Sequence, residues 1–478
     1  MATRRPPTRE ACFGDREQNR MSRFLAAVMV GMLWFLSSAR CVAFEPVYKI
    51  ATFSVDVTCP VGHPLIAGLR QPAKEIIDPL QARGFVLLGA EKPIVLCAVD
   101  WCEIRNRSYE KWRKMLAEAA QTDVARVLVC SLHQHDAPVT DVGAAELLAK
   151  AGLPGAMFDP EFEDKCIRRT AKAVSRCLQN ARRITHLGIG QAKVDRVASN
   201  RRVVIDGKVS YARSSASGGN MTFREAPDGL IDPWLKTLSF WDRDQAVLAL
   251  HAYATHPMSY YGRGGVSWDF VGMARDYRQR DNPNIFQVYV TGCSGDVTAG
   301  KYNNGAPANR EVLARRLYDA MKKAWQNTTR HPLESVSFRK VELDLAFRQT
   351  PSHTAEALRK VLHNPKTNTR NRILAAMGLA SRLRLETGLN IDMPMIDFRK
   401  AKILLFPGET FVGYQLQAQQ MFPDSFVLCI GFGECWPGYI PTTQGFQDRF
   451  NDAWYWVADD SDKRMTAALK RLLAKSRE

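Results

Sequence analysis

The residues best suited to chemistry are His133 and His135, which follow the apolar run of residues 124–132 within the segment His-Gln-His-Asp. We expect the run to be a buried strand that delivers the two imidazoles and Asp136 to the carboxyl edge of a sheet, where open α/β folds bind ligands. Residues two apart on a strand share a face, so both histidines could meet one metal ion or one substrate. The alternative is a pair of solvated or hydrogen-bonded histidines, because imidazole is also a common polar side chain without a metal.

A second strand-like run, residues 246–254, leads to His256 and then Pro257. Proline cannot continue the hydrogen-bond ladder, so we expect His256 at the tip of the strand. His251 lies five residues earlier and faces the opposite way on an extended strand. We therefore assign His251 a structural role and His256 a functional one.

A third apolar run leads into a glycine-rich turn. Gly292, Gly295 and Gly300 allow close approach of the backbone to a ligand, while Asp296 and Thr298 offer a carboxylate and a hydroxyl. The same pattern also fits a plain connection from strand to helix. The glycine spacing matches neither a Walker-A loop nor a dinucleotide fingerprint, so we exclude nucleotide binding.

Two later strand-like runs precede Glu409 and Tyr439. Glu409 lies at the start of a helix, where it could complement the helix dipole for roughly 0.3–1 kcal/mol or supply an anionic metal ligand. Tyr439 follows two turn residues and can point into a cleft.

The elements that must position these residues alternate between strand-like and amphipathic helical runs, which predicts the α/β class. We expect a single layered domain with a mostly buried mixed sheet flanked by helices, and a metal site at the carboxyl ends of its strands. Residues 199–231, rich in Arg, Ser and Gly, are predicted to be a substrate-facing loop. The predicted strands are residues 124–132, 184–194, 235–241, 246–254, 285–291, 336–347, 403–406 and 426–432. The predicted helices are residues 109–120, 161–180, 310–326, 354–362, 371–387, 411–421 and 461–475.

The composition is that of a globular protein: 478 residues, 46% hydrophobic and 24% charged, with a formal net charge of +17. The basic residues form no aromatic-interleaved stripe, zinc finger or helix-turn-helix pattern, so nucleic acid is not an expected partner. Peripheral association with an anionic membrane surface fits the charge better. Nothing in the sequence predicts an oligomeric state.

Residues 1–43 are predicted to be an N-terminal extension and a signal peptide, because an apolar run at residues 24–36 follows Arg23 and precedes small residues. We expect cleavage after Ala43 and export to the periplasm or the extracellular space, with an uncleaved membrane anchor as the alternative. Of the 11 cysteines, Cys12 and Cys41 would be lost. The odd number left predicts at least one free thiol, and disulfides such as Cys97–Cys102 or Cys429–Cys435 remain open.

Taken in order, five motifs resemble those of the neutral/alkaline, non-lysosomal ceramidase family. They are strand-His-x-His-x-x-Pro, Thr-His-Pro-Met-Ser, Gly-Asp-Val-Thr, Pro-Gly-Glu-Thr and Gly-Tyr-Ile-Pro-Thr-Thr, spread over about residues 46–450. The resemblance implies an exported zinc-dependent hydrolase that cleaves an N-acyl amide bond, in ceramide or a related N-acyl lipid, by attack of zinc-bound water. It places the catalytic domain at residues 44–478, without the C-terminal immunoglobulin-like domain of the family.

The resemblance also implies roles for individual residues. The zinc ligands would be His133, His256, Glu409 and Tyr439, a nitrogen and oxygen set suited to zinc. His135 would transfer the proton to the departing amine, and Arg201 would stabilise the developing oxyanion. Independently of the resemblance, we expect Asp136 to orient His135 or a ligand imidazole, since carboxylates commonly fix the tautomer of such rings. Thr298, in the place of the family's serine, would complete the catalytic group. The substrate-binding residues would be Asn200, Asp296 and Tyr455.

Two departures from the family pattern bear on the substrate. Thr298 stands where the family has serine, and Asn451 stands at the place of a family tyrosine, with Tyr455 close by as a substitute. Two alternatives therefore stay open. One is a zinc hydrolase of a non-lipid ester or an N-acyl glycan, and the other is a catalytically inactive homologue that binds lipid or the cell envelope.

Overall fold

The computed structural model describes residues 1–3 and 47–474, and the chain from Val47 onward forms one compact unit. The predicted signal peptide, its uncleaved-anchor alternative and the proposed cleavage after Ala43 lie outside the described residues. Within the described part of the chain, no helix is long and apolar enough to cross a bilayer.

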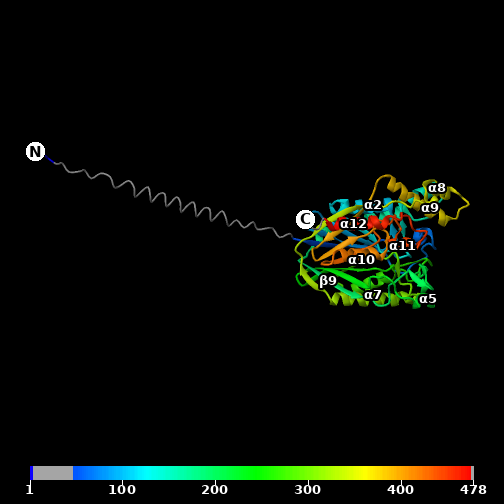
Figure 1. The fold of residues 1–478 in the computed structure, drawn as a ribbon, viewed down its shortest axis with the longest axis horizontal. Helices are drawn as coiled ribbons and strands as arrows, with labels where there is room; N and C mark the ends of the chain where they lie inside the picture. Colours follow the sequence, from blue (N-terminus) through cyan, green and yellow to red (C-terminus); the bar gives the residue numbers. More distant parts are fainter. Residues whose placement is uncertain (4–46, 475–478) are drawn as a thin grey trace. The chain divides into compact units, whose positions relative to one another are not determined.

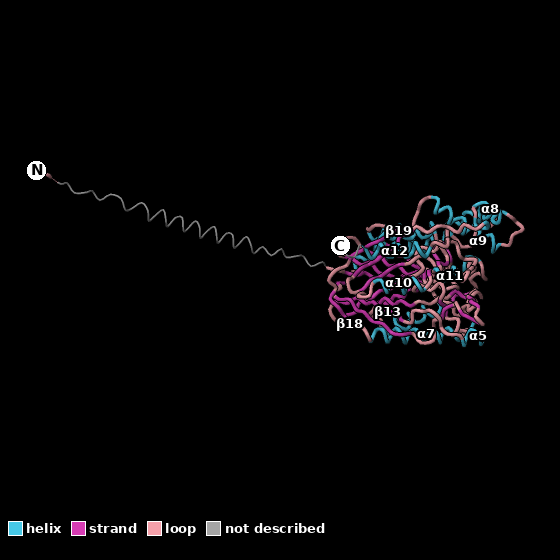
Figure 2. The backbone as a smooth tube through the Cα atoms, in the orientation of Figure 1, coloured by secondary structure: helices cyan, strands magenta, loops and turns pink. Residues whose placement is uncertain are grey.

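Three larger sheets form the core of this unit, and their strands are magenta in Figure 2. The first sheet has the order β6-β4-β3-β1-β8 and the second the order β16-β14-β13-β9-β18. The third sheet has the order β19-β20-β21-β23. In chain order the strands are β1 (Lys49–Asp56), β3 (Gln81–Leu88), β4 (Ile94–Val99), β6 (Val127–Ser131), β8 (Arg182–Arg183), β9 (His186–Lys193), β13 (Trp234–Asp242), β14 (Gln245–Tyr253), β16 (Phe286–Thr291), β18 (Thr329–Pro332), β19 (Ser337–Leu343), β20 (Ile391–Asp397), β21 (Ala401–Leu405) and β23 (Phe426–Ile430).

Each of these sheets is mostly antiparallel but has one parallel pair at its edge: β4 with β6, β14 with β16, and β21 with β23. The carboxyl ends of the three pairs meet. The Ser131 amide donates to the Phe432 carbonyl at 3.0 Å, and the Gly431 amide donates to the Thr291 carbonyl at 2.8 Å. The Thr291 hydroxyl closes the ring by donating to the Leu132 carbonyl at 2.8 Å. The first residues of the loops that follow β6, β16 and β23, which are far apart in sequence, therefore lie close together.

Apolar side chains from all three sheets share one core, which includes Leu96, Leu128, Leu250, Val288 and Ile403. Each of these side chains is fully buried or nearly so. Burial of so much apolar surface holds the three parallel pairs in fixed relation, since interiors of this kind are close-packed.

Helices cover the outer faces of the sheets (Figure 1). Helix α7 packs on β9 and β13, α4 packs on β1, and α12 packs on β19. Helices α8 and α9 pack on each other. The helices of eight or more residues are α2 (Asn106–Ala120), α3 (Val142–Lys150), α4 (Pro160–Cys177), α6 (Asp269–Asp281), α7 (Ala308–Gln326), α8 (Ala355–His363), α9 (Thr369–Glu386), α10 (Val412–Met421) and α12 (Ser461–Ala474).

The predicted α/β class, the buried sheets and the flanking helices are confirmed, but three sheets take the place of one. All seven predicted helices form, and each predicted strand overlaps an observed strand. Helices α3 and α6 and strands β1, β3, β4 and β20 were not predicted. The predicted loop of residues 199–231 is partly regular: it contains β10 (Ser199–Asn200), a hairpin of β11 (Val203–Ile205) with β12 (Lys208–Ser210), and the short helix α5 (Met221–Glu225).

All nine cysteines among the described residues are free and buried. The predicted free thiol is confirmed. The disulfides considered between Cys97 and Cys102 and between Cys429 and Cys435 do not form, so the fold of this part of the chain depends on packing and hydrogen bonds.

Candidate metal centre

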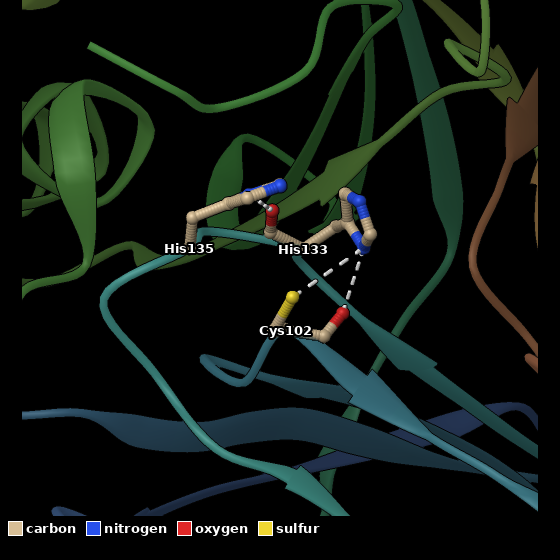
Figure 3. Close-up of side chains that lie close together, drawn as sticks. All are labelled: Cys102, His133 and His135. Carbon is tan, nitrogen blue, oxygen red and sulfur yellow. Dashed lines mark hydrogen bonds between the residues drawn. The ribbon is translucent and has the colours of Figure 1, made fainter. Parts of the chain in front are cut away.

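His133 lies two residues beyond the end of β6. Its amide still donates to the Trp101 carbonyl at 2.9 Å, but its φ of 69° places it in the left-handed region. That conformation costs a non-glycine residue free energy and is typical of functional sites. The expectation that His133 and His135 share a face of an extended strand is therefore wrong. A turn brings them together instead: His135 Nδ1 lies 3.1 Å from the His133 carbonyl oxygen, and the two rings are 4.9 Å apart (Figure 3).

Hydrogen bonds fix the orientation of the His133 ring. Its Nδ1 lies 2.9 Å from the Cys102 carbonyl oxygen, which can only accept, so Nδ1 carries the hydrogen. The Cys102 thiol lies 3.9 Å from the same nitrogen (Figure 3). The Phe432 ring stacks on the imidazole at 4.2 Å. These contacts leave His133 Nε2 buried and without a hydrogen-bond partner among the described residues.

His256 is held in the same way at the end of β14. Its Nδ1 donates to the Ser294 carbonyl at 2.5 Å, and its backbone bridges to Thr298. Nε2 therefore carries a lone pair and lies 3.0 Å from Glu409 Oε2. The predicted structural role of His251 agrees with its contacts, because both of its ring nitrogens bond buried side chains, Thr237 and Gln287.

Glu409 and Tyr439 come from adjacent short strands, β22 (Glu409–Thr410) and β24 (Tyr439–Ile440), in which they are paired in register. Glu409 Oε2 lies 3.5 Å from His133 Nε2, and the ligand atoms of His133, His256 and Glu409 all lie within 4.8 Å of one another. Tyr439 lines the same cavity. The phenol oxygen of Tyr439 accepts a hydrogen bond from Arg201 at 2.8 Å.

The electrostatics of the centre favour a cation. Burial opposes a charge on Glu409, but the two imidazoles hold the pKa of its carboxyl well below the usual range. Burial lowers the pKa of His256 to about 4. Burial also opposes charge on His133, yet the Glu409 carboxylate raises the pKa of that imidazole. The Nε2 atoms of the two imidazoles and the Glu409 carboxylate converge in a buried place, and this donor set fits a divalent metal such as zinc.

The remaining residues predicted for the site lie at different distances from this centre. His135 lines the cavity, and burial together with the neighbouring imidazoles keeps its pKa well below the ordinary value. The carboxylate of Asp136 does not bond His135; it accepts from the Gly262 amide at 2.7 Å, so its predicted part in orienting an imidazole lacks a contact. Burial raises the pKa of Asp136 to about 6.

Asn200 and Asp296 bond each other and do not line the cavity that contains His133 and Glu409. The Asn200 amide donates to Asp296 at 2.8 Å, and both residues line a second cavity of about 230 Å³. Asp296 also accepts from the Val412 amide at 2.8 Å, which fixes the start of α10. The Thr298 hydroxyl is buried and accepts from the Gly300 amide at 3.0 Å. Through these contacts, Asn200, Asp296 and Thr298 hold the loops around the site.

Tyr455 does not line the metal cavity. Its ring packs near Phe446 and Phe450, with Arg348 over it at 4.4 Å. The adjacent Trp454 lines the cavity instead, and its indole nitrogen donates to the fully buried Glu103 at 3.0 Å.

Several residues of the cavity carried no local pattern in the sequence. The cavity has a volume of about 170 Å³, and its wall combines His133, His135, Glu409 and Tyr439 with side chains from five other parts of the chain. The additional residues are Ile66, Leu69, Arg70, Cys102, Tyr261, Arg370, Asp452 and Trp454. Cys102 could have been suspected, because it follows an apolar run in the same way as His133.

No family model matches the sequence, and no curated protein matches it. Solved structures do match the fold, among them two that are named ceramidases. One is the neutral ceramidase from Pseudomonas aeruginosa, with a TM-score of 0.64 and 15% identity over 90% of this chain and 75% of that one. The other, described as a ceramidase complexed with C2, has a TM-score of 0.65 and 13% identity over 91% of this chain and 76% of that one. The chain therefore has the neutral ceramidase fold, as its motifs predicted.

Proposed function

We propose that this protein is a zinc-dependent hydrolase that cleaves the amide bond of an N-acyl lipid of the ceramide type. The observation that carries the proposal is the convergence of His133, His256 and Glu409 on one buried point, with both Nδ1 atoms held as donors. The likeness to two structures that are named ceramidases supports amide hydrolysis as the reaction and a lipid as the substrate.

The residues around the centre would have different roles in metal binding and catalysis. Zinc, when bound, supplies a Lewis acid that polarises a carbonyl and activates water at neutral pH. His133, His256 and Glu409 would hold it, and the Tyr439 oxygen would supply a fourth ligand.

Arg201 is placed to stabilise negative charge that develops on the amide oxygen. One of its terminal nitrogens donates to the Tyr439 oxygen, and its Nε has no partner among the described residues. His135 donates from Nδ1 to a backbone carbonyl, which leaves Nε2 free to take a proton and to pass it to the departing amine.

The test combines metal analysis with hydrolysis of a defined substrate panel. Protein purified after expression in zinc-replete medium should contain about one zinc per chain and release fatty acid from fluorescent ceramide. A chelator should remove both the metal and the activity. Essentially no zinc in folded protein would contradict the proposal and favour the inactive lipid-binding or envelope-binding homologue.

The same panel separates the second alternative. It should include a short N-acyl amide, a carboxylic ester and N-acetylglucosamine beside ceramide. Turnover of the ester or the acetylated sugar without turnover of the lipid amides would assign a zinc hydrolase of another substrate class.

We also propose that the protein is exported and can associate peripherally with anionic membranes, on the basis of the leader-like pattern of residues 21–43 and the net charge of +17. N-terminal sequencing of the secreted or periplasmic protein should begin at residue 44. Co-sedimentation with phosphatidylserine vesicles, absent with phosphatidylcholine vesicles, tests the membrane association.

A further inference from the structure

We infer that the amine half of the substrate carries an acidic group and that Arg70 and Arg370 recognise it. The inference rests on the proposed amide hydrolysis and names its substrate class: N-acyl amino acids. Hydrolysis adds water across the amide, so that the carbon–nitrogen bond breaks and a fatty acid and a free amino acid are released.

Arg70 lines the cavity close to the residue proposed to protonate the amine. Its side chain packs on Gly262, where an added Cβ would lie 3.2 Å from Arg70 Cδ. The neighbouring Tyr261 ring is 4.9 Å from the ring of His135, the residue proposed to protonate the amine. Arg70, Tyr261 and His135 all line the cavity.

Arg370 reaches the cavity from the first turn of α9 and lies on the side of Asp452. The two residues interact electrostatically, since Arg370 is one of the groups that lower the pKa of the Asp452 carboxyl, although burial raises that pKa overall. The amino end of a helix adds further positive potential beside this arginine. Two guanidinium groups, those of Arg70 and Arg370, thus line the cavity.

Neither guanidinium group has a close acidic partner. Within the described part of the chain, no carboxylate lies within ion-pair distance of Arg70 or Arg370, although ion pairs are common elsewhere on its surface. Both side chains belong to exposed residues.

The charge balance of the cavity points to an anionic ligand. Its two carboxylates, on Glu409 and Asp452, face Arg70, Arg370 and the bordering Arg201 even before a divalent metal is added. A neutral lipid headgroup would form no ion pair with Arg70 or Arg370. A carboxylate on the amine side would accept charge-assisted hydrogen bonds from them, the kind that Arg forms best.

The experiment compares two nearly isosteric substrates, N-dodecanoylglycine and its neutral carboxamide, N-dodecanoylglycinamide. The zinc-loaded wild-type protein should have a kcat/KM at least about tenfold higher for the carboxylate, because hydrogen bonds to charged groups are the stronger ones. Arg70→Met and Arg370→Met should each lower kcat/KM for the carboxylate by about 10- to 100-fold and change it less than about threefold for the carboxamide. Arg70→Lys should restore part of the preference, since it keeps the charge without the fork of donors.

Arg263→Met is the matched control. Arg263 is an exposed arginine next to Gly262 that does not line the cavity, so its loss should not change kcat/KM for either substrate. Zinc content and melting temperature should match wild type in every variant, which excludes a general loss of structure.

The outcomes separate the two proposals. Equal turnover of both substrates by wild type, or equal losses for both in the arginine variants, would overturn the acidic-substrate inference and leave amide hydrolysis standing. Turnover of ceramide without turnover of either glycine compound would also overturn the inference and leave the proposed function standing. If zinc-loaded protein cleaves neither ceramide nor the two glycine compounds, the proposed function fails, and calorimetric binding of the same two compounds decides the inference. Tighter binding of the carboxylate that disappears in Arg70→Met and Arg370→Met would support it, and equal binding would overturn it.

Discussion

Gly295 lies directly against the backbone of Glu409: a Cβ at position 295 would be 2.1 Å from the Glu409 carbonyl oxygen. The Gly295 amide also donates to the Thr410 carbonyl at 3.0 Å. This glycine was predicted to let the backbone approach a ligand closely, and what it approaches is the strand that carries the proposed metal ligand Glu409. The glycine-rich turn and the Pro-Gly-Glu-Thr segment form one unit.

Replacement of Gly295 by alanine should displace Glu409, because the Glu409 carbonyl group and the Phe411 ring leave no room for a methyl group. We expect Gly295→Ala to weaken zinc binding by at least about tenfold, the loss typical when the support of a ligand is disturbed. Zinc affinity measured by competition with a chromophoric chelator checks this. Gly219→Ala is the control, since its nearest neighbour would be 3.9 Å away. Unchanged affinity in Gly295→Ala would mean that Glu409 is not a ligand.

The two histidines that follow β6 should respond differently to mutation. His133→Ala should abolish both zinc binding and turnover, because it removes one of the three convergent ligands. His135→Ala should keep the zinc and lose at least about 100-fold in kcat, within the range of general acid–base catalysis. Zinc stoichiometry and kcat on the same preparations test the division. Loss of zinc from His135→Ala would show instead that His135 is a ligand, for which Cys102, His133 and His135 offer an alternative set.

Local patterns predicted which residues end up at the strand tips. Pro257 indicated that the ladder stops before His256, and the apolar run before His133 indicated a buried strand. The same patterns could not predict that β6 ends at Ser131 and that His133 adopts a φ of 69°, because this turn depends on hydrogen bonds to Trp101 and Cys102.

Local sequence patterns also could not predict the part of the cavity wall that Asp452 and Trp454 form. Trp454 is held at the cavity by long-range contacts, among them its bond with Glu103 across 351 positions of sequence. Hydrophobic periodicity reports burial and not the partner, so the three-sheet arrangement was not predicted either. Tyr455 was chosen by proximity in sequence, and its neighbour Trp454 occupies the cavity wall instead.

Arg201 should matter for catalysis more than for metal binding. Its guanidinium donates to the Tyr439 oxygen and does not itself offer a lone pair, so Arg201→Gln should retain zinc. We expect kcat to fall by about 100- to 1000-fold, as for the loss of a donor that stabilises an oxyanion. Steady-state kinetics with parallel zinc analysis is the measurement. A zinc-depleted Arg201→Gln protein would indicate that the arginine acts by holding Tyr439 in place as a ligand.

Tyr439→Phe completes this comparison. It removes the phenol oxygen and keeps the ring that packs near His256 and Phe450. If Tyr439 is the fourth ligand, the variant should bind zinc more weakly by about 10- to 100-fold, whereas Arg201→Gln should not. Equal zinc affinity in wild type and Tyr439→Phe would remove Tyr439 from the ligand set.

Glu163 has no part in the proposed chemistry, but it should make the stability of the fold depend on pH. The side chain is fully buried in the first turn of α4, accepts a hydrogen bond from Ser108 at 2.9 Å, and has its pKa raised by burial from 4.5 to about 7. Between these two pH values the folded protein holds a proton that the unfolded chain has released. The free energy of unfolding contributed by Glu163 therefore falls as the pH rises from about 4.5 to about 7 and is constant above that.

Glu163→Gln removes this titration while keeping the shape of the side chain and its bond with Ser108. The variant should match wild type near pH 4.5 and be more stable by about 1 to 3 kcal/mol at pH 8, the free energy that corresponds to a pKa shift of this size. Urea unfolding at both pH values measures the difference, and subtraction of wild type cancels the other titrating groups. Glu161→Gln, at an exposed position of the same turn, should show no such divergence. A Glu163→Gln protein whose stability tracks wild type at both pH values would mean that Glu163 is ionised in the fold throughout this range.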